Sequence, residues 1–263
     1  MATTSIVDLH SHVLPALDDG PETLEESVEA GRAAVAAGVT ILAATPHVRQ
    51  DYPTTADRME EALAAVRSAY AREGVGLDLR GGGELDLEWL AVLEPREVRR
   101  FGLAGNPSYV LVEFPSGAWP LNLRSVVFQL ALEGIAPVLA HPEINPDVQA
   151  HPERLRELVD AGALVQVTAA SLDGRYGAVA LRTAELLLTA ELVHLVASDA
   201  HGADMRGFDF GGAARRIADP ELERWLLHDV PGAIAGAMPL PERPRRPEHV
   251  RRGRLRRRRV RED

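Results

Sequence analysis

Short apolar runs alternate with longer amphipathic stretches seven times along the chain. Each run is nearly continuous in valine, isoleucine, leucine and alanine, the pattern of strands that are buried on both faces of a sheet. We expect strands at residues 5–10, 39–45, 77–83, 109–114, 135–140, 163–169 and 193–198. Because short links join each strand to the following helix, the pattern predicts an α/β fold with parallel strands.

The stretches between the runs carry helix start and stop signals. Pro21 and the acidic residues after it are typical of a first helical turn, and Gly38 is typical of a helix end. A second helix is expected at 55–73, ending before Gly74. Further helices are expected at 86–100, 121–133, 152–161 and 175–191, and the last helices at 210–238.

Histidines and carboxylates follow the apolar runs at six expected strand ends, and one more carboxylate lies in the loop after the first. The set is His10, His12, Asp19, His47, Glu84, Glu113, His141, Asp199 and His201. Carboxyl ends of parallel strands meet at one end of a barrel, where barrel enzymes place their active sites. An open sheet would gather ligands from only two or three strands. We therefore expect a closed or nearly closed barrel.

The composition of this set predicts metal chemistry. His10 and His12 are two residues apart, so both can face one ion, and Asp199 and His201 share this spacing. Imidazole and carboxylate ligands suit Mn²⁺, Fe²⁺, Zn²⁺ or Co²⁺. Two or three such cations would neutralise carboxylates that otherwise repel one another. They would also activate water for attack on a phosphate ester.

The composition excludes several other classes of protein. The chain has no cysteine, which excludes disulfides, zinc–thiolate sites and catalysis by a cysteine nucleophile. No G-x-S-x-G elbow or P-loop is present. No apolar run approaches the ~20 residues of a membrane span, and the N-terminus lacks the pattern of a signal peptide. We expect a cytoplasmic protein.

The net charge of −10 conceals two regions of opposite charge. All 29 basic residues are arginine, and residues 241–263 hold eleven of them against four acidic residues. We expect residues 1–240 to form one acidic domain and residues 241–263 to form a disordered, arginine-rich tail. Three roles for the tail stay open: a solvated arm, a segment that binds a polyanion, or a segment that docks on the acidic domain.

Seven segments together resemble the PHP (polymerase and histidinol phosphatase) superfamily. They are DLHSHVLPALDDGPETLEES, ATPH, GGELDL, YVLVEFP, LAHPE, VQVTAASLDGRYG and ASDAHGADMR, within residues 5–238. LP-x-x-DDG after the H-x-H, with YVLVEFP and SDAH, favours the bacterial tyrosine-protein phosphatases of capsule and exopolysaccharide operons over histidinol phosphatases. The resemblance implies a distorted seven-stranded (β/α)₇ TIM-like barrel with a site for three metal ions.

The resemblance also implies how the ions share the ligands. The three ions would be held by His10, His12, Glu84 and Asp199, by Glu84, Glu113 and His141, and by Asp19, His47 and His201. Asp18, the neighbour of a ligand, is expected to support the turn. Of the possible metals, Mn²⁺ is favoured.

Members of this branch are expected to grip the phosphate with two arginines. One matches Arg206, which would stabilise the charge that develops during catalysis. The other should fall in HPERN, but this chain reads HPEIN, with Ile144 in its place. A guanidinium group cannot be replaced by a butyl group, and such a loss weakens transition-state binding by ~2–4 kcal/mol. Arg49 and Arg175, on strand-end loops, are candidate substitutes, and Asp86 stands where some relatives have a basic residue.

The residues and the resemblance together predict a metal-dependent phosphoric monoester hydrolase. The leading hypothesis is a protein-tyrosine phosphatase that acts on an autophosphorylating bacterial tyrosine kinase of polysaccharide export. Two alternatives stay open because of Ile144 and the tail. One is a small-molecule phosphatase or nuclease of the same superfamily, and the other is a metal-loaded regulatory module whose tail binds a polyanion. The oligomeric state also stays open, and a homo-oligomer is possible.

Overall fold

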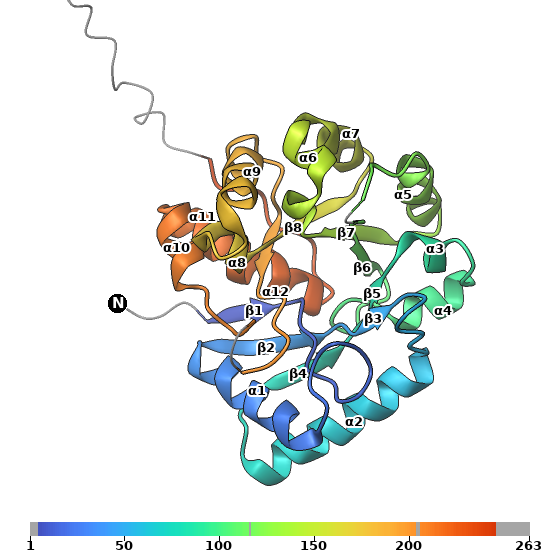
Figure 1. Ribbon diagram of the computed structural model, residues 1–263, viewed down its shortest axis with the longest axis vertical. Helices are drawn as coiled ribbons and strands as arrows, with labels where there is room; N and C mark the ends of the chain where they lie inside the picture. Colours follow the sequence, from blue (N-terminus) through green and yellow to red (C-terminus); the bar gives the residue numbers. More distant parts are fainter. Residues whose placement is uncertain (1–4, 116, 204–205, 246–263) are drawn as a thin grey trace, which may run out of the picture.

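The computed structural model describes residues 5–115, 117–203 and 206–245. Within these ranges, short parallel strands lie in the middle of the molecule and helices cover their outer sides, as Figure 1 shows. No helix among the described residues is both long and apolar enough to cross a bilayer. Most of the predicted tail, residues 246–263, lies outside the described residues.

All seven predicted strands are present, and two of them are split. Five runs form one strand each: β1 (Ile6–Asp8), β6 (Tyr109–Glu113), β7 (Ala136–Ala140), β8 (Leu164–Thr168) and β9 (Leu195–Ala197). The second run forms β2 (Val39–Ala44), which is followed after Pro46 by β3 (His47–Val48). The third forms β4 (Asp78–Gly81), followed by β5 (Glu84–Leu85). Proline cannot donate a ladder hydrogen bond, which accounts for the first interruption.

The strands form two sheets rather than one. One sheet has the order β1-β2-β4, the other has the order β3-β5-β6-β7-β8-β9, and every strand pairing is parallel, as predicted. Neither sheet closes on itself among the described residues, so the predicted seven-stranded closed barrel is not confirmed. An isolated parallel bridge between Ser11 and Ala200 joins the ends of β1 and β9. There His12 donates its backbone N–H to the Ala200 carbonyl at 2.7 Å.

The two long N-terminal helices are present, but the first begins at Leu24, three residues after Pro21, which was expected in its first turn. Thr23 caps α1 (Leu24–Ala36), and Thr55 caps α2 (Ala56–Glu73), each with a hydroxyl that accepts a backbone N–H from the first turn. Gly74 adopts the left-handed conformation that ends α2.

One predicted helix is wrong in extent, whereas the region 210–238 holds several helices, as expected. The helix expected at 86–100 is two helices, α3 (Leu87–Leu90) and α4 (Pro95–Arg100), because Pro95 starts a new helix. The region 210–238 is divided into α10 (Gly211–Ile217), α11 (Pro220–Arg224), the π-helical η3 (Trp225–Asp229) and α12 (Val230–Ala235). Pro220, after the capping Asp219, starts α11.

The other predicted helices are present, and three short ones were not predicted. The former are α5 (Leu123–Leu132), η2 (Pro152–Arg154) with α7 (Leu155–Asp160), and α9 (Gly177–Thr189). The latter are η1 (Pro142–Ile144), α6 (Pro146–Ala150) and α8 (Ala169–Asp173). All three lie after the carboxyl end of β7 or β8.

A buried carboxylate ties the first strand to the last. Asp8 is fully buried and accepts the backbone N–H of Ser198 at 3.0 Å and its hydroxyl at 2.5 Å. Burial raises the pKa of Asp8 to about 6. The tie fixes the segments after β1 and β9 relative to each other, and these segments carry four of the predicted ligands.

Candidate metal centre

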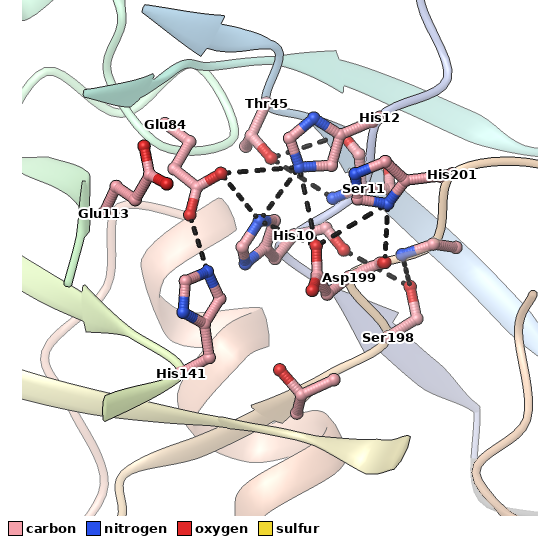
Figure 2. A network of polar contacts seen from close by, with 12 residues as sticks. His10, Ser11, His12, Thr45, Glu84, Glu113, His141, Ser198, Asp199 and His201 are labelled. Atoms are coloured by element: carbon pink, nitrogen blue, oxygen red, sulfur yellow. Dashed lines mark hydrogen bonds and ion pairs between the residues drawn. The ribbon is translucent and has the colours of Figure 1, made fainter. Parts of the chain in front are cut away.

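All nine predicted ligands lie at or after the carboxyl ends of the strands, in contact with one another. Figure 2 labels all of them except Asp19 and His47. They come from seven segments: His10 and His12 after β1, Asp19 in the next loop, His47 in β3, Glu84 in β5, Glu113 in β6, His141 after β7, and Asp199 and His201 after β9. Parallel strands bring these positions together because every strand ends on the same side.

Three groups of these side chains have ligand atoms close enough to hold a metal ion. The groups are His12, Asp19, His47 and His201; His10, Glu84 and His141; and His10, His12 and Asp199, each with ligand atoms within 4.8 Å of one another. Compared with the expected sets, the first group adds His12, the second has His10 in place of Glu113, and the third lacks Glu84. Glu113 lies beside them, with its Oε2 3.7 Å from His47 Nδ1.

In three of the histidines, the ring nitrogen Nδ1 forms a hydrogen bond with an oxygen. His10 Nδ1 lies 2.9 Å from Gln166 Oε1, and His12 Nδ1 lies 2.6 Å from Asp18 Oδ2. His201 Nδ1 lies 2.9 Å from the backbone carbonyl of Asp199. Because these oxygens accept hydrogen bonds, each Nδ1 carries the proton and each Nε2 presents a lone pair to the cluster. Such outer partners are typical of metal-binding histidines.

The side chains present fit divalent cations. His10 Nε2 and His12 Nε2 lie 3.2 Å apart, and two lone pairs that face each other at this distance need a cation or a proton between them. Buried cluster atoms without a hydrogen-bond partner include Glu84 Oε2, Glu113 Oε2 and His201 Nε2. Buried polar atoms in proteins are rarely unpartnered, and a metal ion would satisfy these.

The electrostatics of the cluster show the same need for positive charge. Burial lowers the pKa of His12, but hydrogen bonds to Asp18, Asp199 and Glu84 outweigh burial, so this pKa is raised well above its ordinary value. Burial also lowers the pKa of His141, but the hydrogen bond to Glu84 and the charge of Glu84 outweigh burial, so this pKa is raised to about 9. Nearby histidines hold the pKa values of Glu84 and Asp199 below the ordinary range despite burial. Without cations, the carboxylates would therefore draw protons onto the histidines.

A cavity of about 500 Å³ opens beside the cluster. Its walls are Asp19, His47, Arg49, Glu113, His141, Ile144, Tyr176, Asp199 and Arg206. Arg206 reaches Asp199 Oδ2 at 3.3 Å and Asp19 Oδ2 at 3.4 Å. Arg49 pairs with Glu113 Oε1 at 2.7 Å and with Asp51 at 2.9 Å. The cavity thus has ligand residues and two guanidinium groups in its wall, which suits an anion.

The model of the CpsB/CapC family, which is described as capsular polysaccharide synthesis, matches residues 6–222 of this chain. The chain belongs to this family. It is 34% identical to the tyrosine-protein phosphatase YwqE of Bacillus subtilis over 77% of this chain and 80% of that protein. It is 28% identical to the tyrosine-protein phosphatase CpsB of Streptococcus agalactiae over 76% of this chain and 85% of that protein.

A solved structure of relatives in this family is similar to this chain in its fold. It comes from work on YwqE from Bacillus subtilis and CpsB from Streptococcus pneumoniae, described as unique metal-dependent tyrosine phosphatases. The two folds superpose with a TM-score of 0.80 and 29% sequence identity, over 92% of this chain and all of the other.

In this member of the CpsB/CapC family, the predicted arginines lie in different surroundings. Arg49 and Arg206 line the cavity, whereas Arg175 does not. Arg175 Nε instead pairs with Asp173 at 2.6 Å, and its Nη2 donates to the Asp209 carbonyl at 3.3 Å. Ile144 lines the cavity as an apolar surface.

Three residues of this site were missed or only partly anticipated by the sequence. Asp18 supports the turn, as predicted, by accepting the Gly20 N–H at 3.0 Å, but it also holds His12. Gln166 was missed, although a glutamine inside the apolar run LVQVT is a signal for a buried polar contact. Tyr176 was also missed; its hydroxyl lies 3.5 Å from Asp199 Oδ2, and burial raises its pKa.

Proposed function

We propose that this protein is a metal-dependent protein-tyrosine phosphatase, a phosphoric monoester hydrolase. The observation that carries the proposal is the buried cluster of histidines and carboxylates that forms part of the wall of an arginine-containing cavity. Similarity to named tyrosine-protein phosphatases over more than three quarters of the chain supports the choice of substrate.

Two or three divalent cations would occupy the cluster, whose imidazole and carboxylate ligands suit Mn²⁺, Fe²⁺, Zn²⁺ or Co²⁺, and the resemblance favours Mn²⁺ among them. The ligands proposed are His10, His12, Asp19, His47, Glu84, Glu113, His141, Asp199 and His201. When bound, such cations supply activated water and neutralise the charge of a phosphate ester. Hydrogen bonds to Gln166, Asp18 and the Asp199 carbonyl would keep the proton of three ligand histidines on Nδ1, so that each Nε2 is free to bind a cation.

The substrate phosphate would be held by the two arginines of the cavity wall. Arg206 would stabilise the negative charge that develops on the phosphoryl oxygens, because its guanidinium already lies against ligand carboxylates. Arg49 lines the same cavity as Ile144, so we infer that it supplies the positive charge that Ile144 cannot. Arg175 has no place in this arrangement unless it leaves Asp173.

We also propose that the two sheets are parts of one distorted seven-stranded barrel. β2 continues into β3 and β4 into β5 with only two residues between the members of each pair. The Ser11–Ala200 bridge brings the first and last strands together. Counted in this way, the strands number seven, which supports the PHP-like barrel over residues 1–240.

The physiological substrate we propose is the phosphotyrosine of a bacterial tyrosine kinase of polysaccharide export. The family to which the chain belongs, capsular polysaccharide synthesis, supports this assignment. Such a kinase takes its phosphate from ATP, so we place the reaction in the cytoplasm.

The experiment that tests the proposed function is hydrolysis of p-nitrophenyl phosphate and a phosphotyrosine peptide by the purified protein, with and without Mn²⁺. We expect Mn²⁺-dependent turnover of both substrates, lost in His10→Ala and retained in His151→Ala, an exposed histidine outside the cluster. Sugar phosphates and oligonucleotides serve as competing substrates. Faster turnover of either would replace the tyrosine phosphatase with a small-molecule phosphatase or a nuclease, and no turnover of any ester would contradict the proposal.

A further inference from the structure

A second, larger cavity adjoins the one beside the metal centre. Its volume is about 740 Å³, and it shares Arg49 and Glu113 with the first cavity. The rest of its wall comes from α3 and the residues that flank it, and from described residues between β6 and α5. In Figure 1, α3 lies near β3 and β5. A molecule whose phosphate occupies the first cavity can therefore extend directly into the second.

The wall of the second cavity combines negative charge with apolar surface. Asp86 and Glu88 supply two carboxylates, and Leu87 and Pro120 supply apolar surface. Asp86 Oδ1 accepts the backbone N–H of Trp89 at 2.7 Å and so caps α3. Neither Asp86 nor Glu88 forms a salt bridge with any residue in the described ranges.

Among the described residues of this wall, Arg49 is the only arginine, and it is already paired. Arg49 contacts Glu113 and Asp51, at 2.7 and 2.9 Å. The negative charge of Asp86 and Glu88 is thus not compensated within the cavity, so an incoming cationic group would find partners there. The methylene stem of an arginine or lysine would pack on the apolar part of the wall while its head reaches the carboxylates.

We propose that this second cavity binds a basic side chain of the protein substrate, located within three residues of the phosphotyrosine. The inference rests on the proposed function and adds a sequence preference to it. An extended chain advances about 3.3–3.6 Å per residue, so residues one to three positions from the phosphotyrosine lie within about 10 Å of it. The shared wall makes the second cavity the nearest surface for them on that side.

The test compares two phosphotyrosine peptides that carry either arginine or glutamine at the three positions on each side of the phosphotyrosine. The variant is Asp86→Asn/Glu88→Gln, in which asparagine keeps the helix cap and removes the charge. The matched control is Glu61→Gln/Glu221→Gln, which removes two exposed carboxylates outside the cavity. Hydrolysis of p-nitrophenyl phosphate, which has no flanking residues, reports on the metal centre alone.

We expect the wild-type protein to hydrolyse the arginine peptide with a kcat/KM roughly five- to tenfold higher than the glutamine peptide, as two exposed ion pairs allow. This preference should disappear in Asp86→Asn/Glu88→Gln, persist in the control and shrink in high salt. Turnover of p-nitrophenyl phosphate should stay unchanged in both variants.

Equal turnover of the two peptides by the wild type would overturn the inference, as would a preference that survives in Asp86→Asn/Glu88→Gln. Both results leave the phosphatase standing if p-nitrophenyl phosphate is hydrolysed. Failure of the wild type to hydrolyse p-nitrophenyl phosphate or either peptide would instead overturn the proposed function, and this inference with it.

Discussion

The two ends of the strands place histidine in opposite electrostatic surroundings. At the carboxyl ends, His12 and His141 lie among carboxylates that raise their pKa values, to about 9 for His141. At the amino end of β9, His194 is largely buried beside Trp225 and Arg243. There burial, and next the charge of Arg243, lower the pKa of His194 to about 4.

This difference separates a binding site from a structural contact. The carboxyl end has an excess of carboxylates that divalent cations would neutralise, so its stability should depend on metal. The amino end is satisfied without any ligand, because the neutral His194 ring accepts the Val165 N–H through Nδ1 at 3.1 Å. The two ends should therefore respond to different treatments.

Removal of divalent cations should have the largest effect, and only at the carboxyl end. Chelation should reduce phosphatase activity by ~10³-fold or more, because the activated water and the charge compensation are both lost. It should also lower the melting temperature by roughly 6–12 °C, which corresponds to about 3 kcal/mol of lost binding energy. Activity assays and calorimetry with EDTA and then Mn²⁺ would measure both changes.

A variant at the amino end provides the control for this prediction. His194→Asn keeps the site intact, so it should show the same metal-dependent shift in melting temperature as the wild type. A melting temperature that is equal with EDTA and with Mn²⁺ would contradict the role assigned to the cluster.

Replacement of Arg206 should have the next largest effect. Arg206→Gln removes a guanidinium from the wall of the cavity and should lower kcat/KM by roughly 30- to 1000-fold, or ~2–4 kcal/mol. Arg175→Gln is the matched control, because Arg175 pairs with Asp173 outside the cavity, and it should change kcat/KM less than threefold. Steady-state kinetics with p-nitrophenyl phosphate would measure kcat/KM for both variants. Equal losses in the two variants would show that Arg175 moves into the site.

The sequence predicted the parts of this molecule that follow from chain periodicity. All seven strands were placed because apolar runs buried on both faces are continuous, and most of the candidate ligands were placed because they end or follow such a run. The resemblance, rather than periodicity, implied that Glu84 and His141 would meet, and they lie 2.9 Å apart.

The parts that were missed depend on hydrogen bonds between distant segments. Gln166 and His10 are 156 residues apart in sequence, and no local pattern reports their contact. The splits that produce β3 and β5 were also missed, although Pro46 precedes β3 and Gly82 and Gly83 precede β5. The division of the 86–100 helix was predictable, since Pro95 is typical of a helix start.

Gln166 offers a smaller test of the carboxyl end. Gln166→Leu removes the acceptor for His10 Nδ1 and should weaken Mn²⁺ binding by roughly 10- to 100-fold, the usual cost of losing an outer partner of a metal ligand. Gln166→Glu keeps an acceptor and should restore most of the affinity. Titration calorimetry would measure both. Equal weakening in the two variants would indicate a packing role, because packing alone does not distinguish an acceptor from its absence.

The smallest expected effect is a pH dependence of stability at the amino end. His194 has a folded pKa of about 4, below the ordinary value of 6.5, so the unfolded chain binds the proton more readily between these values. The stability from neutral His194 is therefore fully present above pH 6.5 and is lost as the pH falls toward 4. The loss between pH 7 and pH 5 should be about 1–2 kcal/mol.

His194→Asn tests this prediction, because asparagine can still accept the Val165 N–H but cannot titrate. Between pH 7 and pH 5, the unfolding free energy of the variant, measured by urea denaturation, should fall by about 1–2 kcal/mol less than that of the wild type. Parallel curves for the two proteins would show that His194 already binds a proton when folded, and the contrast between the two ends would fail.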